Sequence, residues 1–586
     1  MKKILLATLV FILSGQLLFA ANPVLTANAT QVCYDGTTKP ILTIVAGSGK
    51  TSYVSSVIND PTDAISTKGI LFTATNNPTS FDISSDNASV VPVAKVTMTL
   101  ISGDQYLCKI TPIAVGFATI SITANNGSPS STYKIELAAS AASSNGVNTV
   151  FPTGIADASA AAAIDDNYMF IADDETNLLR LFSRKESGQS IYSLDITSSA
   201  GGIVGEEFDL EGATNSSATY NSGKRIYWIA SLGNNKSGEI KSLRDRVIAT
   251  DISGSGANTT LSVKSYSTKM RTALISWGDA NSWNFTASAA DGMIPKRIDG
   301  FNIEGLTVCN EGEKAYIGFR APCVPIKGTT PTSGNRKYAL LAPVTNFESM
   351  MNVSGMSSTT PTMDEPVLFD FGGLGIRSIE RVGGNKYLIV AGLFEGGGIP
   401  AVYLWDGVVP ANSGTTPITT ASTGLTKLPL DLSDLVQPSV DGGVEGHPEA
   451  LIAEQVGSDL HIHIICDNGT VDYYNDGTQA KVFAADSYEF PFAKYRMDNF
   501  VYTLPTVGLA CFQKSTSYTC QVQNNTASIM GLTQPTTISL FDLSGNCILN
   551  VCTQSTEITI PLPSKGLFVA KIANEKTNES IKILNK

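Results

Sequence analysis

A short acidic phrase recurs along the chain. It reads FDLEGAT at 208–214, FNIEGLT at 301–307, GIRSIERV at 375–382 and GGVEGHPEAL at 442–451. In each copy a Glu directly follows Leu, Ile or Val, and these residues are Glu211, Glu304, Glu380 and Glu445. A turn-rich interval and a strand-like apolar run come after every copy, as in IYWIAS at 226–231. The recurrence predicts one supersecondary unit that is repeated along the chain.

An earlier segment carries the same pattern with a different acid. The stretch GIADASAAAAIDDNYMFIADDETNLLRLFS at 154–183 has Asp157 where the other copies have Glu, and strand-like runs follow it. Five acidic phrases therefore open five units of short strands. Radial packing of four-stranded sheets hides apolar faces between neighbouring units and leaves few open edges. We predict an all-β chain in which residues 150–505 form a β-propeller of five to seven blades.

The composition agrees with a turn-rich β protein and narrows the range of partners. Of 586 residues, 51 are Gly, and only 16% are charged. The formal net charge of -12 repels phosphate backbones, so we expect no nucleic-acid partner. Residues 1–20 combine Lys2 and Lys3 with an apolar run and a small-residue exit, which is typical of a secretory signal peptide. Since no later window is apolar over about 18 residues, we predict an exported, soluble mature chain without a transmembrane segment.

Two flanking segments differ from the repeats. Residues 22–140 alternate apolar and polar positions between Gly, Asn and Ser turns, which predicts a small β-sandwich. Its phrases SSDNASVV at 84–91 and GFATISITA at 116–124 resemble bacterial Ig-like domains. Residues 507–586 indicate a second small sandwich. There TISLFDLSGNCILNV at 537–551 and EITIPLPSKGLFVAKI at 557–572 closely resemble the C-terminal sorting domain of the type IX secretion pathway.

The sorting-domain resemblance implies both a partner and a location. It implies passage across the inner membrane by the signal peptide, and then across the outer membrane by the type IX secretion machinery. We therefore expect the protein to be secreted or held on the outer cell surface. The alternative is a sandwich added for stability alone, which composition does not distinguish from a sorting domain.

The repeat region also resembles a known group of proteins. The resemblance rests on DASAAAAIDDNYMFIADDETNLLRLF, on FDLEGAT with RIYWIASLGNNKSGEIKSLRDRVIAT, and on FNIEGLT with AYIGFRAPC, and it covers about residues 157–467. These stretches are similar to secreted bacterial proteins of unknown function that are related to phytase-like or esterase-like propellers. The resemblance implies a propeller that is related to hydrolases, and it does not supply an established activity.

The repeated acids are candidates for a metal site. The first strand of each propeller blade lines the central channel, so a repeated position on that strand points to one place. Asp157, Glu211, Glu304, Glu380 and Glu445 would then form a partial ring of carboxylates. Like charges at close range call for a cation between them, and calcium takes about six to eight oxygen ligands. The predicted calcium ligands are Asp157, Asp173, Asp174, Asp209, Glu211 and Glu304.

Arginine offers a second way to balance the acidic ring. Its planar fork pairs with a carboxylate or with a phosphate-type anion, and several Arg residues interrupt otherwise apolar or turn-like sequence. We predict that three of them grip a small anionic substrate. A His two residues after Glu445 is a candidate general acid/base. The predicted catalytic residues are Glu211, Glu304, Glu445, His447, Arg320, Arg377 and Arg244.

Two kinds of function fit this pattern. The first is an exported, metal-dependent hydrolase of phosphate-type or other anionic esters, similar to phytase-like propellers. The alternative is a non-catalytic cell-surface binding or scaffold protein that recognises glycan or protein, in which the acids only tie neighbouring blades together by hydrogen bonds. An open, Arg-lined funnel would favour the enzyme. A plugged channel with exposed aromatic side chains would favour binding, and the tryptophans to locate are Trp228, Trp277, Trp283 and Trp405.

Overall fold

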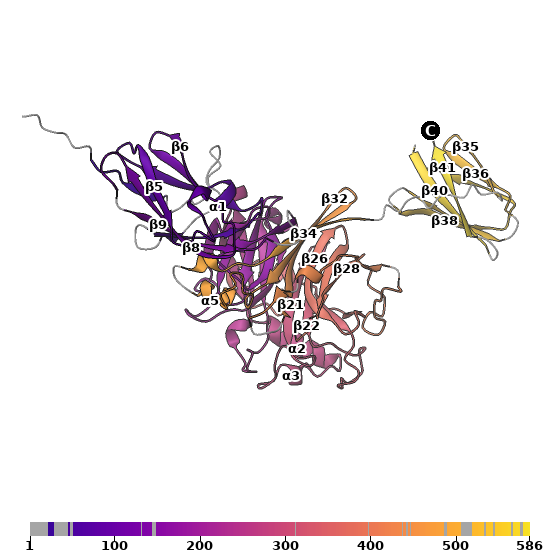
Figure 1. The fold of residues 1–586 in the computed structure, drawn as a ribbon. Helices are drawn as coiled ribbons and strands as arrows, with labels where there is room; N and C mark the ends of the chain where they lie inside the picture. The colour runs from indigo at the N-terminus through magenta and orange to yellow at the C-terminus, as the bar shows by residue number, and fades with distance from the viewer. Residues whose placement is uncertain are drawn as a thin grey trace, which may run out of the picture. The chain divides into compact units, whose positions relative to one another are not determined.

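The structure is a computed structural model. It describes residues 21–27, 45–46, 51–130, 132–142, 148–310, 312–395, 398–422, 424–435, 437–440, 444–445, 447–485, 489–504, 518–532, 535–542, 545–563, 566–574 and 578–585. The predicted signal peptide at 1–20 lies outside these residues. The chain divides into two compact units, residues 1–502 and 503–586. The chain is all-β, as predicted (Figure 1).

The first unit begins with two sheets that enclose one core. One sheet has the order β1 (Leu25–Ala27), β4 (Ile70–Ala74), β7 (Gln105–Ile110) and β6 (Val96–Ser102). The other has the order β2 (Val45–Ala46), β3 (Thr51–Val57), β9 (Tyr133–Ser140), β8 (Gly116–Asn125) and β5 (Ser80–Ser85). Phe72 of the first sheet meets Tyr133 of the second edge to face, with 5.0 Å between ring centroids. This arrangement is a β-sandwich, and the one-turn helix α1 (Ala64–Thr67) covers one end of its core.

The rest of the first unit contains, among the described residues, five antiparallel four-stranded sheets and three short additional pairings that involve β24 (Gly355–Ser357), β11 (Pro152–Thr153) and β30 (Gln437–Pro438). From the innermost strand outward, the first sheet is β12 (Ala158–Ala163), β13 (Tyr168–Asp173), β14 (Leu178–Ser183) and β16 (Tyr192–Asp195), and the second is β17 (Leu210–Asn215), β18 (Arg225–Ala230), β19 (Val247–Ser253) and β20 (Thr260–Ser267). In the same order, the third sheet is β21 (Asn302–Val308), β22 (Ala315–Ala321), β23 (Ala339–Val344) and β25 (Val367–Phe369), and the fourth is β26 (Gly375–Gly383), β27 (Lys386–Gly392), β28 (Ala401–Trp405) and β29 (Leu425–Lys427). The fifth sheet is β32 (His447–Val456), β33 (Asp459–Asp467), β34 (Met497–Thr503) and β10 (Thr149–Val150). Each innermost strand contacts the next, and β32 contacts β12. These sheets are the five blades of a propeller, which confirms the predicted architecture at the lower end of its range.

The last blade closes the ring with a strand from the start of the propeller. β10 pairs with β34 in antiparallel register, so the outermost strand of this blade precedes the first blade in sequence. The Thr149 hydroxyl donates a hydrogen bond of 2.7 Å to Asp498, whose carboxylate also accepts from the buried Arg496. This pairing joins the two ends of the propeller, so that opening the ring requires breaking buried polar contacts.

Small residues let the inner strands approach one another closely. A Cβ built on Gly212 would lie 3.2 Å from the carbonyl oxygen of Glu304 in the next blade. A Cβ on Gly305 would lie 3.1 Å from Ile379 Cγ2, again in the next blade. Contacts this short are tighter than normal packing, so the Gly after Glu in the recurring phrase is explained by close packing between blades.

Shorter elements complete the first unit. β24 (Gly355–Ser357) adds a parallel strand to the outer edge of the second blade, β11 (Pro152–Thr153) pairs with β15 (Gly188–Gln189), and β30 (Gln437–Pro438) pairs with β31 (Val444–Glu445). The helices α2 (Met270–Ala280), α3 (Phe285–Ser288) and α4 (Phe347–Met351) pack against the propeller core. In the part of the chain that the structure describes, no helix combines the length and apolar character needed to span a bilayer.

An aromatic cluster joins the sandwich to the propeller. Phe117 of β8 lies 5.1 Å from Tyr474 and 6.2 Å from Phe483, measured between ring centroids. Phe483 belongs to α5 (Ala480–Ala484), which Figure 1 shows beside β8. Lys494 lies in the same interface and donates a hydrogen bond of 2.8 Å to Ser140 at the end of β9. The two parts therefore share a buried contact with a lysine inside it.

The second unit has its own core between two sheets. One sheet has the order β35 (Thr519–Gln523), β36 (Thr526–Met530) and β39 (Glu557–Pro561). The other has the order β38 (Cys547–Thr553), β37 (Thr536–Phe541), β40 (Gly566–Ala573) and β41 (Asn578–Asn585). Ile529, Ile538 and Ile572 are fully buried between them. This sandwich matches the β-rich character that the sequence predicts for the C-terminal segment.

Candidate functional site

One polar position is structurally equivalent in all five blades. Each innermost strand has a register shift against its neighbour near its start, which leaves one residue bulged out of the ladder. We call this set the bulge row, and its members are Ser159, Glu211, Glu304, Arg377 and Glu449. The Ser159 hydroxyl donates a hydrogen bond to the carbonyl of Leu210 in the next blade. The bulge row therefore connects successive blades.

A buried ion-pair network occupies the last three positions of the bulge row. Arg320 Nη1 lies 2.5 Å from Glu304 Oε1, and Arg377 Nε lies 3.2 Å from Glu304 Oε2. Arg377 Nη2 donates to Glu449 Oε1 at 2.6 Å. Burial opposes ionisation of Glu449, but Arg377 and Arg320 outweigh it and hold its pKa below the usual value. The network ties three blades together through buried charged side chains.

The predicted ring of five acids needs correction at three positions. Glu380 lies three residues beyond Arg377 on β26, opposite Leu388, and burial raises its pKa to about 8. Glu445 belongs to β31, which pairs with β30 outside the blade. Asp157 precedes the bulge of its strand and pairs with Asp467. The sequence repeats were aligned on an acid that follows the apolar residue, and this alignment is out of register in three blades. The structure has Arg377 at the position predicted for Glu380, Glu449 at that predicted for Glu445, and Ser159 at that predicted for Asp157.

A cavity of about 590 Å³ opens beside the bulge row. We call it the funnel. Its lining includes Glu211, Arg320 and Glu449 from the inner part of the propeller and the exposed Lys236 and Lys296 from loops. Its acidic lining residues are Asp174, Glu175, Glu206, Glu207, Asp209, Glu211 and Glu449. The funnel thus combines a carboxylate-rich wall with cationic side chains.

Three carboxylates converge on the funnel wall. One oxygen from each of Asp174, Asp209 and Glu211 lies within 4.8 Å of the others. Asp174 Oδ1 and Glu211 Oε2 are buried and have no hydrogen-bond donor. Burial and neighbouring carboxylates raise the pKa of both groups well above their usual values. Hard cations such as calcium take carboxylate oxygens as ligands, so these three side chains fit a calcium site.

The backbone brings Asp209 to this cluster in an uncommon conformation. Asp209 has a φ of 61°, in the left-handed region, directly before β17. Aspartate tolerates this region better than most residues, and strained backbone collects at functional sites. Burial raises the pKa of Asp209 to about 6, although Arg244 acts in the opposite direction. The strained residue thus supports a functional reading of the cluster.

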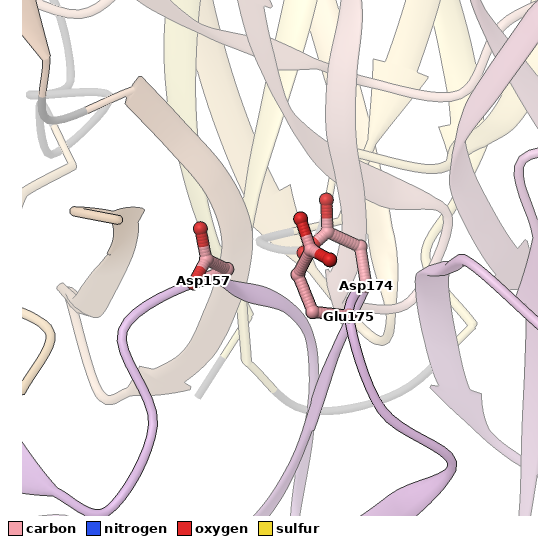
Figure 2. Close-up of side chains that lie close together, drawn as sticks. All are labelled: Asp157, Asp174 and Glu175. Carbon is pink, nitrogen blue, oxygen red and sulfur yellow. The ribbon is translucent and has the colours of Figure 1, made fainter. Parts of the chain in front are cut away.

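A second group of carboxylates shares one member with the first. Oxygens of Asp157, Asp174 and Glu175 also lie within 4.8 Å of one another. Figure 2 shows Asp157 on one segment facing Asp174 and Glu175 on the segment after β13. The sequence indicates Glu175 only as part of the acidic run at 172–175. Asp174 is therefore common to both groups.

Two predicted calcium ligands lie elsewhere. Asp173 points to Arg180, with 2.8 Å between Oδ2 and Nη1. Glu304 belongs to the buried network with Arg320 and Arg377. Both carboxylates already have a positive partner, so the predicted ligands that the structure brings together are Asp157, Asp174, Asp209 and Glu211.

The predicted anion-binding arginines are also engaged. Arg244 lies 2.6 Å from Asp209 and 2.7 Å from Glu207, measured between nitrogen and oxygen. Arg320 donates from Nε to the carbonyl of Phe394 at 3.0 Å in addition to its contact with Glu304. Arg377 spans Glu304 and Glu449, as described above. Lys296, which the sequence pattern did not single out, lines the funnel and forms no ion pair with any described residue.

His447 lies beside the network rather than in the funnel. It lines a small neighbouring cavity together with Arg377 and Leu393. Burial and the positive charge of Arg377 lower the pKa of His447 to about 4. The imidazole is therefore neutral at physiological pH. His447 lines this cavity and is not among the residues that line the funnel.

The tryptophans do not form an exposed platform. Trp228 of β18 and Trp405 of β28 are fully buried in the blades, and Trp283, which lies between α2 and α3, is also fully buried. Trp277 is half-buried and donates to the carbonyl of Asp364 at 3.0 Å. The structure therefore has the charged funnel expected of an enzyme, and its tryptophans do not supply the exposed aromatic face expected of a binding protein.

A family model matches part of the propeller. A family described as "Protein of unknown function (DUF3616)" matches residues 256–434. No curated protein matches the chain.

The solved structures to which the chain is similar include PorZ, described as an essential bacterial surface component of the type-IX secretion system of Porphyromonas gingivalis. It is 11% identical, with a TM-score of 0.25, over 93% of this chain and 71% of that chain. The PQQ-bound aldose sugar dehydrogenase of Streptomyces coelicolor is 8% identical, with a TM-score of 0.24. The match covers 61% of this chain and 99% of that chain. Inulosucrase of Halalkalicoccus jeotgali is 14% identical, with a TM-score of 0.28. The match covers 61% of this chain and 84% of that chain.

Proposed function

We propose that this protein is a divalent-cation-dependent hydrolase of small anionic esters, with its active site in the funnel. The observation that carries the proposal is the convergence of Asp174, Asp209 and Glu211, two of which keep a buried oxygen without a donor. Lys236 and Lys296 line the same cavity and suit an anionic substrate. The funnel volume of about 590 Å³ is in the range of small-molecule sites.

In this proposal, three carboxylates bind the cation and an arginine orients one of them. Asp174, Asp209 and Glu211 would hold a calcium ion, which supplies Lewis-acid polarisation of the ester and of a bound water. Arg244 fixes Asp209 through an ion pair of 2.6 Å, and so limits the orientations of that ligand. In the hydrolysis, water oxygen bonds to the acyl or phosphoryl centre, the bond to the alkoxy oxygen breaks, and the released alcohol takes a proton from the water.

The test of this proposal is cation-dependent turnover. We expect the calcium-loaded protein to hydrolyse at least one member of a panel of nitrophenyl phosphate, phosphonate, sulfate and carboxylate esters, and chelation with EGTA to abolish the rate. Glu211→Gln keeps the size of the side chain but removes its charge, so we expect kcat/KM to fall by at least about 100-fold.

Glu365→Gln is the matched control, because Glu365 is exposed and its ion pair among the described residues is the one with Lys327 at the surface. Its rate is expected to equal that of the unchanged protein. If no ester in the panel is turned over with any divalent cation, the hydrolase is rejected and the binding protein becomes the better account.

We further propose that the protein reaches the outer cell surface through its C-terminal unit. The support is the motif order at 537–572, together with the separate compact unit that residues 503–586 form. Removing residues 503–586 is expected to leave the protein protected from proteinase K in intact cells. Degradation of both the full and the shortened protein by external proteinase would show that this unit is not needed for export.

A further inference from the structure

A second cavity, of about 510 Å³, lies where the sandwich meets the propeller, and we call it the junction cavity. The sandwich contributes Ala141 and Ala142, which follow β9, and the propeller contributes side chains from the segments 434–440 and 471–475. None of the described residues that line it also lines the funnel. Its volume is in the range of small-molecule sites. The protein therefore has a candidate binding site that is separate from the funnel.

Part of the lining of the junction cavity is apolar and aromatic. Phe151 and Tyr473 both line it and meet edge to face, with 6.0 Å between ring centroids. Val471 lies beside them in the lining. The Tyr473 hydroxyl is buried and has no hydrogen-bond partner among the described residues. Native proteins seldom leave such a group unsatisfied, so this part of the lining suits a ligand with both an apolar face and hydroxyl groups.

The charged side chains of the junction cavity already have partners in the protein. Arg496 lies 2.9 Å from Asp434 and 2.7 Å from Asp498, measured between nitrogen and oxygen. The Asp472 carboxylate accepts hydrogen bonds of 2.8 to 3.3 Å from three backbone N–H groups of its own loop. An ionic ligand would lose hydration on entry and would meet no unpaired opposite charge among the described lining residues. The cavity therefore favours a neutral ligand.

Asn475 supplies an uncommitted amide in the lining. It is exposed, and its side chain forms no hydrogen bond with any described residue. Its φ of 57° is in the left-handed region, which asparagine tolerates, and the backbone contacts of Asp472 hold the loop around it. An amide offers both a donor and an acceptor, as a hydroxyl group does. Asn475 can thus bind a ligand hydroxyl without first breaking a contact within the protein.

We propose that the junction cavity binds a neutral sugar unit. A pyranose ring has an apolar C–H face and a rim of hydroxyl groups, which matches aromatic side chains beside amide and carboxylate groups. The C–H face packs against Tyr473, and hydroxyl groups bond with Asn475 and Asp472. This site makes the protein a carbohydrate-binding protein whether or not the funnel hydrolyses esters.

Saturation-transfer difference NMR and calorimetry test the proposal on the full protein in EGTA, so that no divalent cation takes part. The probes are methyl glycosides of glucose, galactose, mannose, xylose and N-acetylglucosamine, and the trisaccharides maltotriose, cellotriose and xylotriose. We expect at least one probe to bind with a Kd between about 0.1 and 10 mM. Tighter binding of a trisaccharide would assign a glycan chain and equal binding a single sugar, and both results support the site.

Two variants change the junction cavity in different ways. Asn475→Gly removes the amide while glycine keeps the left-handed backbone, so we expect binding to weaken by about 10-fold or more. Ala142→Trp introduces a large side chain from an exposed position that lines the cavity, and it is expected to abolish binding. Glu211→Gln is expected to bind the sugar as the unchanged protein does, which separates this site from the funnel.

Asn524→Gly is the matched control, because Asn524 is also an exposed asparagine with a positive φ, of 49°, and it lies in the second unit. It is expected to leave the affinity unchanged. The proposal is overturned if no probe binds, or if binding survives in both Asn475→Gly and Ala142→Trp. Binding of a probe without turnover of any ester would support the sugar site while rejecting the hydrolase.

Discussion

Replacing Glu304 by glutamine is expected to lower the free energy of unfolding by about 3 to 5 kcal/mol. Glu304 is fully buried and meets the guanidinium groups of Arg320 and Arg377. Both Arg residues stay charged at any accessible pH, so the variant leaves two buried cations without their shared ion-pair partner, and Arg377 keeps its ion pair with Glu449. Chemical denaturation followed by tryptophan fluorescence measures the change.

Glu380→Gln is the control for this variant, because Glu380 lies on the next inner strand and has no ion pair among the described residues. Burial raises its pKa to about 8, so the acid is mostly neutral at pH 7 and glutamine closely resembles it. We expect a change below about 1 kcal/mol. Equal losses from both substitutions would show that the network does not hold the blades together.

The stability of the first unit is expected to rise between pH 7 and pH 9 because of Lys494. Its ammonium group is fully buried among Phe151, Tyr473 and Tyr474, and burial lowers its pKa from 10.5 to about 7. Between these values the unfolded chain carries the proton and the folded chain does not. Stability therefore increases as the pH rises through this window, by about 2 kcal/mol from pH 7 to pH 9.

Lys494→Met isolates this effect from other titrating groups. The charged groups nearest to Lys494 are Asp60 and Asp63 of the sandwich, and both oppose the lowering of its pKa. The methionine variant removes the ammonium group and is expected to lose the Lys494 contribution to the slope. Thermal unfolding of both proteins at pH 7, 8 and 9 provides the measurement. Parallel curves for the two proteins would contradict a buried, titrating lysine.

The sequence was sufficient to predict the propeller but not its number of blades. The inner strands are buried throughout, as in β21 and β22, and their recurring acidic phrase marks each blade. The outer strands carry a weaker pattern. β16 alternates half-buried and exposed positions, and β29 has three residues. The closing strand β10 has only two residues and lies before the first phrase, so a count of strong patterns could not include it.

The equivalent positions of the blades were harder to predict. Aligning the phrases by Glu placed Glu380 and Glu445 in the row, whereas the structure places Arg377 and Glu449 there. A different local signal marks the true position, because each member of the bulge row precedes Ala, Gly or Ser. That signal reflects close packing between inner strands, which becomes apparent once the sheets are assembled. Pairing of arginines with acids across blades likewise depends on tertiary structure.

A crystal structure of the full chain grown with calcium tests the central claim most directly. We predict an ion bound by oxygens of Asp174, Asp209 and Glu211 at about 2.3 to 2.6 Å. Anomalous scattering would identify it as calcium. The result that contradicts the account is a structure in which these three carboxylates contact only water, protein donors or one another while calcium is present at millimolar concentration.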